Sequence, residues 1–229
     1  MTKDGTTFPK AASATLAGGN VATGNGGGIC IENAFTEETY FDNDTTVTMS
    51  GGIIEANQAG TGGGLYMVRG SVTNAGIVNF TMNKASDSSA YGFYGNTAAT
   101  NGAGIYASSN NATAAAQRYV VNLNGGEVAA NVATTNGGGA FITGGAKLVV
   151  NGGIMDSNKA NTRNGGAVYI NSDGAEAVIS NGQISNNYAA QHGGGIQAFD
   201  ANLTVSGGNI TKNESGTAGG GLAIRGSAL

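Results

Sequence analysis

The chain has 229 residues, a formal net charge of -4 at pH 7 and no run of Lys or Arg, which argues against a nucleic-acid partner. Glycine is enriched to 42 residues, whereas there is one proline and one cysteine, so neither a collagen triple helix nor an internal disulfide framework fits. No apolar segment approaches the ~18 residues that a membrane span needs, so no membrane insertion by this segment is expected. Many Asn, Thr, Ser and Gly residues predict a β-rich chain with many turns.

In chain order, residues 1–17 are expected to cap the fold or to stay flexible, and residues 18–229 to form one repetitive domain. Seven related glycine blocks, each closed by an aliphatic residue or alanine, recur along that domain. They are GGGI (26–29), GGGL (62–65), GAGI (102–105), GGGA (137–140), GGAV (165–168), GGGI (193–196) and GGGL (219–222). Apolar residues alternate with a period of two after each block, which predicts a short strand with one buried face.

A second block falls between the glycine blocks. Its copies are VTMSGGIIEAN (47–57), VNLNGGEVAAN (121–131), LVVNGGIMDSN (148–158), AVISNGQISNN (177–187) and LTVSGGNITKN (203–213), with a distorted copy that ends in FTMN (80–83). Each copy closes with an apolar residue, two spacers and an asparagine. These asparagines are Asn57, Asn83, Asn131, Asn158, Asn187 and Asn213.

Three short strands in each repeat of ~27 residues predict an all-β fold, a parallel β-helix or β-solenoid of about six to seven coils. At ~4.8 Å for each coil, the rod would be roughly 30 Å long. Insertions are expected near residues 30–46, 86–101 and 106–118, where the spacing between blocks is longest. The glycines would turn a corner in every coil, because positive φ or close backbone stacking leaves no room for a Cβ. The asparagines would form a structural turn ladder, bonding to the turn backbone or to the Asn one coil away.

The two motifs, GG[GA]-[ILV] and apolar-x-x-Asn, resemble the repeats of chlamydial polymorphic outer-membrane proteins. They are more similar to the β-helix repeats of large adhesin-like surface proteins from gut bacteria and archaea. The resemblance covers residues 18 to 229. It implies a right-handed β-helix that is secreted or displayed on a cell surface, as a stalk or a ligand-binding passenger. It transfers no catalytic residue.

The outward position of the strand after each glycine block predicts a candidate ligand-binding surface. Along the stack this position holds Cys30, Tyr66, Tyr106, Phe141, Tyr169, Gln197 and Ala223. The four consecutive aromatics, Tyr66, Tyr106, Phe141 and Tyr169, would form an exposed ladder that stacks on sugars or on a partner's apolar surface. The alternative is a structural ladder, stabilised by its own stacking or covered by the insertions. Tyr91, Phe93 and Tyr94 would extend or cover that face.

Other chemistry-bearing residues have simpler interpretations. The densest acidic set, Glu32, Glu37, Glu38, Asp42 and Asp44, contains no base and predicts a solvated loop rather than a catalytic or calcium site. His192 stands where Asn25, Asn101, Asn136 and Asn164 stand in other repeats, so it is interpreted as a turn residue. Cys30 should point outward, and a free thiol is favoured over an intermolecular disulfide. No metal or cofactor is expected.

The sequence therefore favours a non-catalytic, extracellular segment of a surface adhesin or stalk that contacts a glycan or a host-surface protein. The first alternative is a self-assembling filament subunit whose coils stack head to tail. The second is a carbohydrate-active enzyme of the β-helix type, which lacks a catalytic constellation in this sequence.

Overall fold

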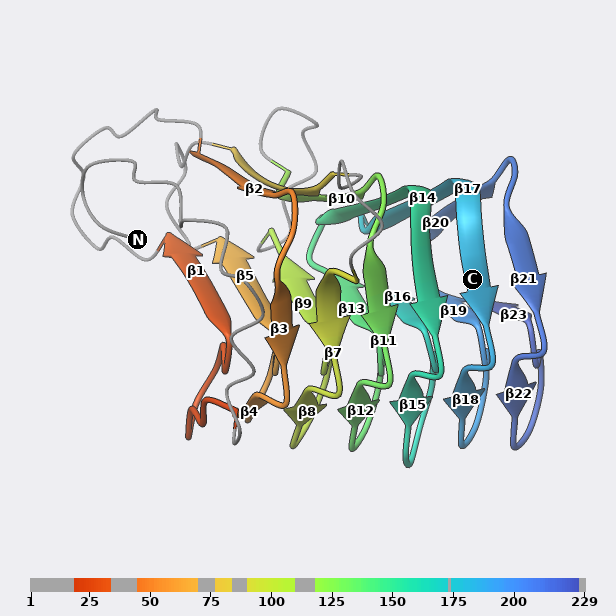
Figure 1. Ribbon diagram of the computed structural model, residues 1–229. Coiled ribbons are helices and arrows are strands. Elements are labelled where there is room, and N and C mark those ends of the chain that lie inside the picture. The colour runs from red at the N-terminus through yellow and green to blue at the C-terminus, as the bar shows by residue number, and fades with distance from the viewer. Residues whose placement is uncertain are drawn as a thin grey trace.

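The computed structural model of the protein describes residues 19–33, 45–69, 77–83, 90–109, 118–172 and 174–226. Every regular element within these ranges is a β-strand. These ranges contain no helix that is long and apolar enough to span a membrane. The strands form three parallel sheets, and successive strands of each sheet lie side by side from the red end of Figure 1 to its blue end.

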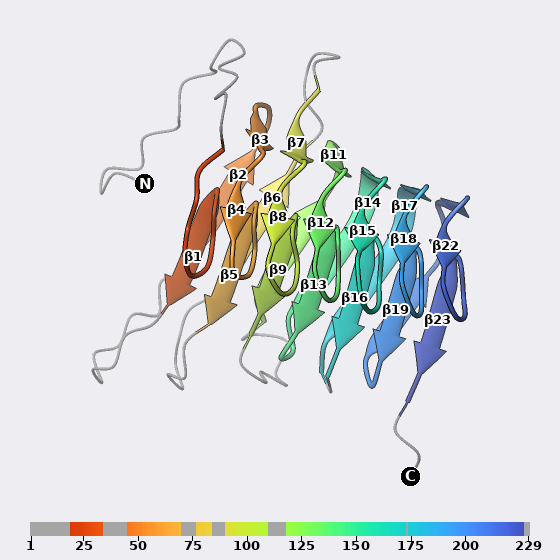
Figure 2. The same ribbon diagram turned by 90° about the horizontal axis from the view of Figure 1, so that it is seen from below.

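The first sheet consists of the strands that follow the glycine blocks, and Figure 2 shows them as a row of parallel arrows. In spatial order they are β1 (Ile29–Asn33), β5 (Leu65–Arg69), β9 (Ile105–Ser108), β13 (Ala140–Thr143), β16 (Val168–Asn171), β19 (Ile196–Phe199) and β23 (Leu222–Arg225).

The second sheet contains the two strands predicted from the second block, which merge into one long strand in β14 and β17. Its strands are β2 (Thr45–Met49), β6 (Val78–Met82), β10 (Val120–Leu123), β14 (Lys147–Asp156), β17 (Glu176–Ser185), β20 (Asn202–Val205), β3 (Ile53–Glu55), β7 (Gly92–Tyr94), β11 (Glu127–Ala129) and β21 (Asn209–Thr211).

The third sheet is made of two-residue strands along the lower edge of Figure 1. They are β4 (Gln58–Ala59), β8 (Thr97–Ala98), β12 (Val132–Ala133), β15 (Lys159–Ala160), β18 (Tyr188–Ala189) and β22 (Glu214–Ser215). Between successive strands of the first sheet the chain visits the second and third sheets. This all-β stack of parallel sheets is consistent with the predicted β-solenoid.

The glycine blocks set the register of the first sheet, as the sequence predicts. Leu65 pairs with Ile29 on one side and with Ile105 on the other, and the closing residue of every later block continues the row. The first glycine of each block has a positive φ between 62° and 70°. A Cβ on Gly139, the third glycine of its block, would lie 2.6 Å from the carbonyl oxygen of Ala167. Both predicted reasons for glycine at the corner are therefore confirmed.

The core is a continuous column of aliphatic and aromatic side chains between the first and second sheets. Leu65, Met67, Ile105 and Ile142 from the first sheet are fully buried in it, and so is Phe80 from the second. The period-two alternation predicted the inward positions of the first sheet. Because each strand pairs with a strand from a different repeat, each repeat buries its apolar face only together with its neighbours.

One repeat differs from the prediction. The FTMN segment belongs to β6, where Phe80 pairs with Val47 and with Val121, so it occupies the second strand of its unit, at the start of the second block rather than at its end. The third strand of that unit is β7, in which Phe93 lies between Ile54 and Val128. The insertion expected at residues 86–101 therefore contains two regular strands, β7 and β8.

The other insertion boundaries also shift. Strands β1 and β2 extend into the expected insertion at 30–46, and β9 reaches Ser108 in the one expected at 106–118. Of the three expected insertions, residues 34–44, 86–89 and 110–117 lie outside the described residues. So does the N-terminal segment, residues 1–17.

Candidate functional site

The four aromatic residues predicted on the first sheet are neighbours in the structure, and we call Tyr66, Tyr106, Phe141 and Tyr169 the aromatic ladder. Strand pairing brings each ring beside the next. The ring centroids are 5.3, 5.3 and 5.2 Å apart along the ladder. The first two pairs are nearly parallel, with interplanar angles of 13° and 6°, and the third is tilted by 46°.

The stacking restricts what the aromatic ladder can bind. Each interior ring has a neighbouring ring on both faces, and Phe141 and Tyr169 are only 7% and 9% exposed. A sugar that stacks on an aromatic needs a free ring face. Tyr66, at the end beside the small and exposed Cys30, is half-buried and has a ring on one side only. The ladder therefore packs on itself along most of its length, and Tyr66 is its more exposed end.

The tyrosines of the ladder are held in the neutral form. Burial raises the pKa of Tyr66 to about 12, with smaller contributions from Tyr106, Glu32 and Cys30. Burial also raises the pKa of Tyr106 and of Tyr169. Because an uncharged hydroxyl both donates and accepts hydrogen bonds, the row presents apolar rings with neutral polar tips.

The predicted turn asparagines form a ladder in which Asn96 replaces Asn83 and which is buried from Asn57 to Asn187. Its members are Asn20, Asn57, Asn96, Asn131, Asn158, Asn187 and Asn213. At each step the backbone N–H and the Nδ2 group of one Asn donate to the Oδ1 of the next, at 2.8–3.1 Å. We call these seven residues the asparagine ladder.

Asn83 is not part of the asparagine ladder, because it follows β6 rather than β7. Its Oδ1 accepts a hydrogen bond from Asn124 Nδ2 at 3.2 Å, in the second sheet. Asn96 stands in the ladder position instead, three residues after the buried Phe93. The sequence did contain a signal for Asn96, because Phe93 and Asn96 have the same apolar-x-x-Asn spacing as Phe80 and Asn83.

His192 occupies a corner position, as predicted. Its backbone N–H donates to Asn164 Oδ1 at 3.2 Å, and Asn164 in turn donates to Asn136 Oδ1. The ring Nε2 of His192 lies 2.7 Å from Nη1 of Arg225. Because a guanidinium only donates, Nε2 is the acceptor of this hydrogen bond.

Cys30 is exposed, as the alternation predicts. Partial burial, followed by the nearby Glu32 carboxylate, raises the pKa of its thiol, which disfavours the reactive thiolate. Glu32 is exposed on β1. The other acidic residues of the expected loop, Glu37, Glu38, Asp42 and Asp44, lie outside the described residues.

Tyr91, Phe93 and Tyr94 lie on or beside the second sheet and do not extend the aromatic ladder. Phe93 is buried in the core and packs at 5.7 Å on Phe80. Tyr94 donates from its hydroxyl to Glu127 Oε2 at 3.0 Å. These contacts fix β7 against β6 and β11, which is a structural role.

A three-residue ionic cluster on the second sheet was not expected from the sequence. Glu176 accepts from Arg118 Nη1 at 2.7 Å and from Lys147 Nζ at 3.0 Å, and the three side chains are mostly buried. Lys147 and Glu176 are directly paired across β14 and β17. Charge pairs across neighbouring strands stabilise a sheet, so the cluster joins adjacent repeats.

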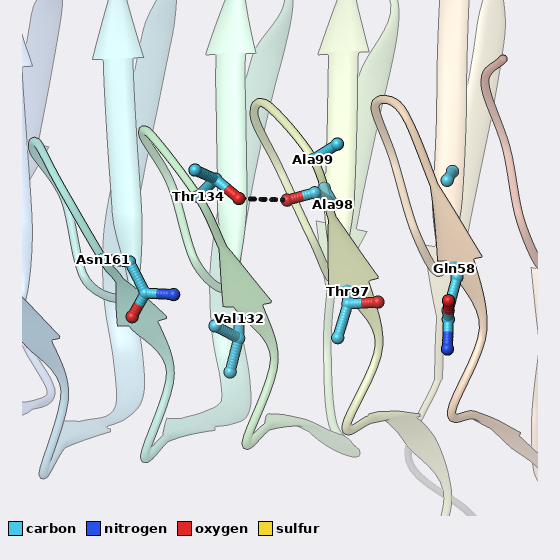
Figure 3. Close-up of a pocket in the computed structure, with 8 residues that line it drawn as sticks. Gln58, Thr97, Ala98, Ala99, Val132, Thr134 and Asn161 are labelled. Atoms are coloured by element: carbon cyan, nitrogen blue, oxygen red, sulfur yellow. Dashed lines mark hydrogen bonds between the residues drawn. The ribbon is translucent and has the colours of Figure 1, made fainter. Parts of the chain in front are cut away.

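A depression of about 330 Å³ lies on the third sheet, apart from the aromatic ladder. Figure 3 shows Gln58, Thr97 and Val132 along its successive strands, and Thr134 bonded to the Ala98 carbonyl. Its lining contains no charged side chain, cysteine or histidine. Within the described ranges, no group of three or more His, Cys, Asp or Glu residues could hold a metal ion.

No family model matches the chain, and no curated protein or solved structure matches it. The class of protein is therefore defined by the stacked parallel sheets alone, which are compatible with a β-helix. The resemblance of the repeats to adhesin-like surface proteins stays a prediction.

Proposed function

We propose that the chain is a non-catalytic structural segment of a secreted or surface-displayed adhesin or stalk, built as a right-handed parallel β-helix of six to seven coils. One observation carries this proposal. The asparagine ladder, the apolar core and the glycine corners run without interruption from Asn20 to Asn213. Such a column has a fixed length and direction, because every backbone corner is bonded to the next. A rigid spacer needs those two properties.

Contact with a partner would come from the exposed end of the aromatic ladder. Tyr66 combines a half-buried ring with a neutral hydroxyl, next to the small Cys30 side chain. A sugar or an apolar protein surface can stack on such a ring. The partner proposed here is a glycan or a host-surface protein.

The adhesive part of the proposal is tested by screening the purified chain on immobilised glycans and on host-cell surfaces. Wild type should bind, Tyr66→Ala should lose binding, and Tyr188→Ala, which removes an outward ring on the third sheet, should bind as wild type. Absence of binding by wild type, or equal binding by both variants, would refute the contact point. Antibodies against the chain should also label intact cells of the source organism, and labelling only after permeabilisation would refute surface display.

A self-assembling filament subunit is the second candidate, because apolar side chains are exposed at both ends of the described array. Val21 and Ile53 are exposed at the β1 end, and Val205, Leu222 and Ile224 at the β23 end. Contact between unlike ends is heterologous and generates an open filament. Electron microscopy across a concentration series distinguishes filaments from separate short rods.

A further inference from the structure

The asparagine ladder has a direction, and its two ends differ. At every step the donor is the Asn nearer the N-terminus and the acceptor is the next Asn along the chain. Asn20 donates to Asn57, and none of the described residues donates to the Oδ1 of Asn20. Asn213 accepts from Asn187 and gives one Nδ2 hydrogen to Ile184 O at 2.8 Å. Its backbone N–H and its second Nδ2 hydrogen have no acceptor among the described residues, so one end of the ladder needs a donor and the other an acceptor.

The apolar rows on the first sheet are also open at both ends. On β23, Leu222 is 37% exposed and Ile224 is 69% exposed, whereas Ile196, one repeat earlier in the same row, is fully buried. On β1, Ile29 and Ile31 are only partly buried against the core. Both ends therefore display the inward side of a strand that lacks its next neighbour among the described residues.

Extending the sheet by one strand of another copy would bring opposite charges together. The register of the first sheet places Leu222 of one copy beside Ile29 of the other, and Ile224 beside Ile31. The next outward position then pairs Arg225 with Glu32, both of which are exposed. Ala223 faces Cys30 in this register, and two small side chains leave room for the strands to approach. Unlike charges on directly opposite residues favour pairing of the strands.

We propose that β23 docks in parallel on β1 of a second copy of this chain, with Arg225 opposite Glu32 and Asn213 donating to the Oδ1 of Asn20. This inference rests on the filament candidate and specifies its joint. The contact joins unlike ends, so each added copy exposes a new β23 edge. The apolar rows supply the attraction, and the charge pair and the asparagines fix the register.

The test reverses the charge on either side of the joint, and sedimentation velocity over a concentration series at low salt measures the association of each variant. Wild type should form a ladder of oligomers that grows with concentration. Arg225→Glu and Glu32→Arg, each alone, place like charges at every joint, and each should weaken association about tenfold. In an equimolar mixture the two variants can alternate, and every joint between unlike variants then carries an opposite-charge pair, native in one kind of joint and reversed in the other, so the mixture should assemble as wild type does. Arg163→Glu, a charge reversal at an exposed corner within the array, should leave assembly unchanged.

Each other outcome overturns the joint. Assembly that neither single variant weakens, or that the mixture does not restore, means that copies meet through another surface, although a filament function would survive. Growth that stops at a dimer indicates an isologous contact and excludes the open joint. A chain that stays monomeric throughout the series refutes both this joint and the filament candidate. Circular dichroism of each variant verifies that the fold is retained.

Discussion

Asn131 Oδ1 accepts two hydrogen bonds from Asn96, one from the backbone N–H and one from Nδ2, both at 2.9 Å. The side chain of Asn131 is fully buried, and its own Nδ2 donates to Phe93 O and to Asn158 Oδ1. The amide group therefore uses both of its hydrogens and both acceptor positions of its oxygen. Chains of such bonds polarise one another in a low-dielectric interior, so the amides of successive repeats are coupled.

Replacing Asn131 by alanine should destabilise the protein by about 2–4 kcal/mol, because it leaves two buried donors of Asn96 without an acceptor. The change is measured as the shift of the urea unfolding midpoint multiplied by the slope of the transition. Asn161→Ala is the control, because that side chain is exposed and takes part in no hydrogen bond of the ladder. A loss of under about 0.5 kcal/mol for Asn131→Ala would contradict a buried, coupled amide row.

The Gly166 corner position should tolerate no side chain. A Cβ there would overlap the carbonyl oxygen of Gly194 and lie 2.6 Å from that of Tyr188. Both are backbone atoms of the neighbouring repeat and cannot rotate away, so Gly166→Ala should cost about 2–3 kcal/mol of unfolding free energy. Gly51→Ala meets nothing within 4 Å and should stay within about 0.5 kcal/mol of wild type. Thermal unfolding of both variants tests this, and equal melting temperatures would count against close stacking at the corner.

The sequence predicted the corners and the register because both repeat as local patterns. It misassigned one repeat because an F-x-x-N motif occurs twice, at Phe80 to Asn83 and at Phe93 to Asn96. The spacing to the next glycine block distinguishes them. Asn96 precedes Gly102 by six residues, and Asn131 precedes Gly137 by six as well.

The sequence also predicted the aromatic ladder, but it left open whether the rings are exposed or packed on one another. Alternation along a strand places Phe141 on the outward side, and an outward side chain is expected to be accessible. Its low exposure arises because the rings of Tyr106 and Tyr169 cover its two faces. That packing depends on ring orientation and on three strands from different repeats, which no single stretch of sequence specifies.

The Glu176 cluster should contribute modestly to stability, in a salt-dependent way. Glu176→Gln keeps the shape of the side chain but removes the charge that pairs with Arg118 and Lys147, and should cost about 0.5–1 kcal/mol. Because the side chains retain some solvent contact, salt should screen the interaction. Urea unfolding at low salt and at about 1 M NaCl measures the difference. Glu214→Gln, an exposed carboxylate on β22, is the matched control, and an equal effect of both variants would argue against a specific cluster.

The folded state should protect the Tyr66 hydroxyl from ionisation. Its pKa is raised to about 12, chiefly by burial, whereas tyrosine in an unfolded chain titrates near ~10. At pH values between these two, the unfolded chain releases the Tyr66 proton and the folded chain keeps it. By linkage, the contribution of this group to stability is fully present below about pH 10 and is lost as the pH rises through about 12.

Tyr66→Phe isolates this contribution, because phenylalanine stacks as well but cannot ionise. The stabilities of wild type and Tyr66→Phe should run in parallel up to about pH 9 and then converge or cross, since wild type falls more steeply. Urea midpoints measured across that range give the two curves. Ultraviolet absorbance, which reports phenolate formation, provides an independent check. Folded Tyr66→Phe should contain one tyrosine fewer that ionises only at high pH than folded wild type. Curves that stay parallel up to about pH 11 would show that Tyr66 ionises as freely in the folded chain as in the unfolded one.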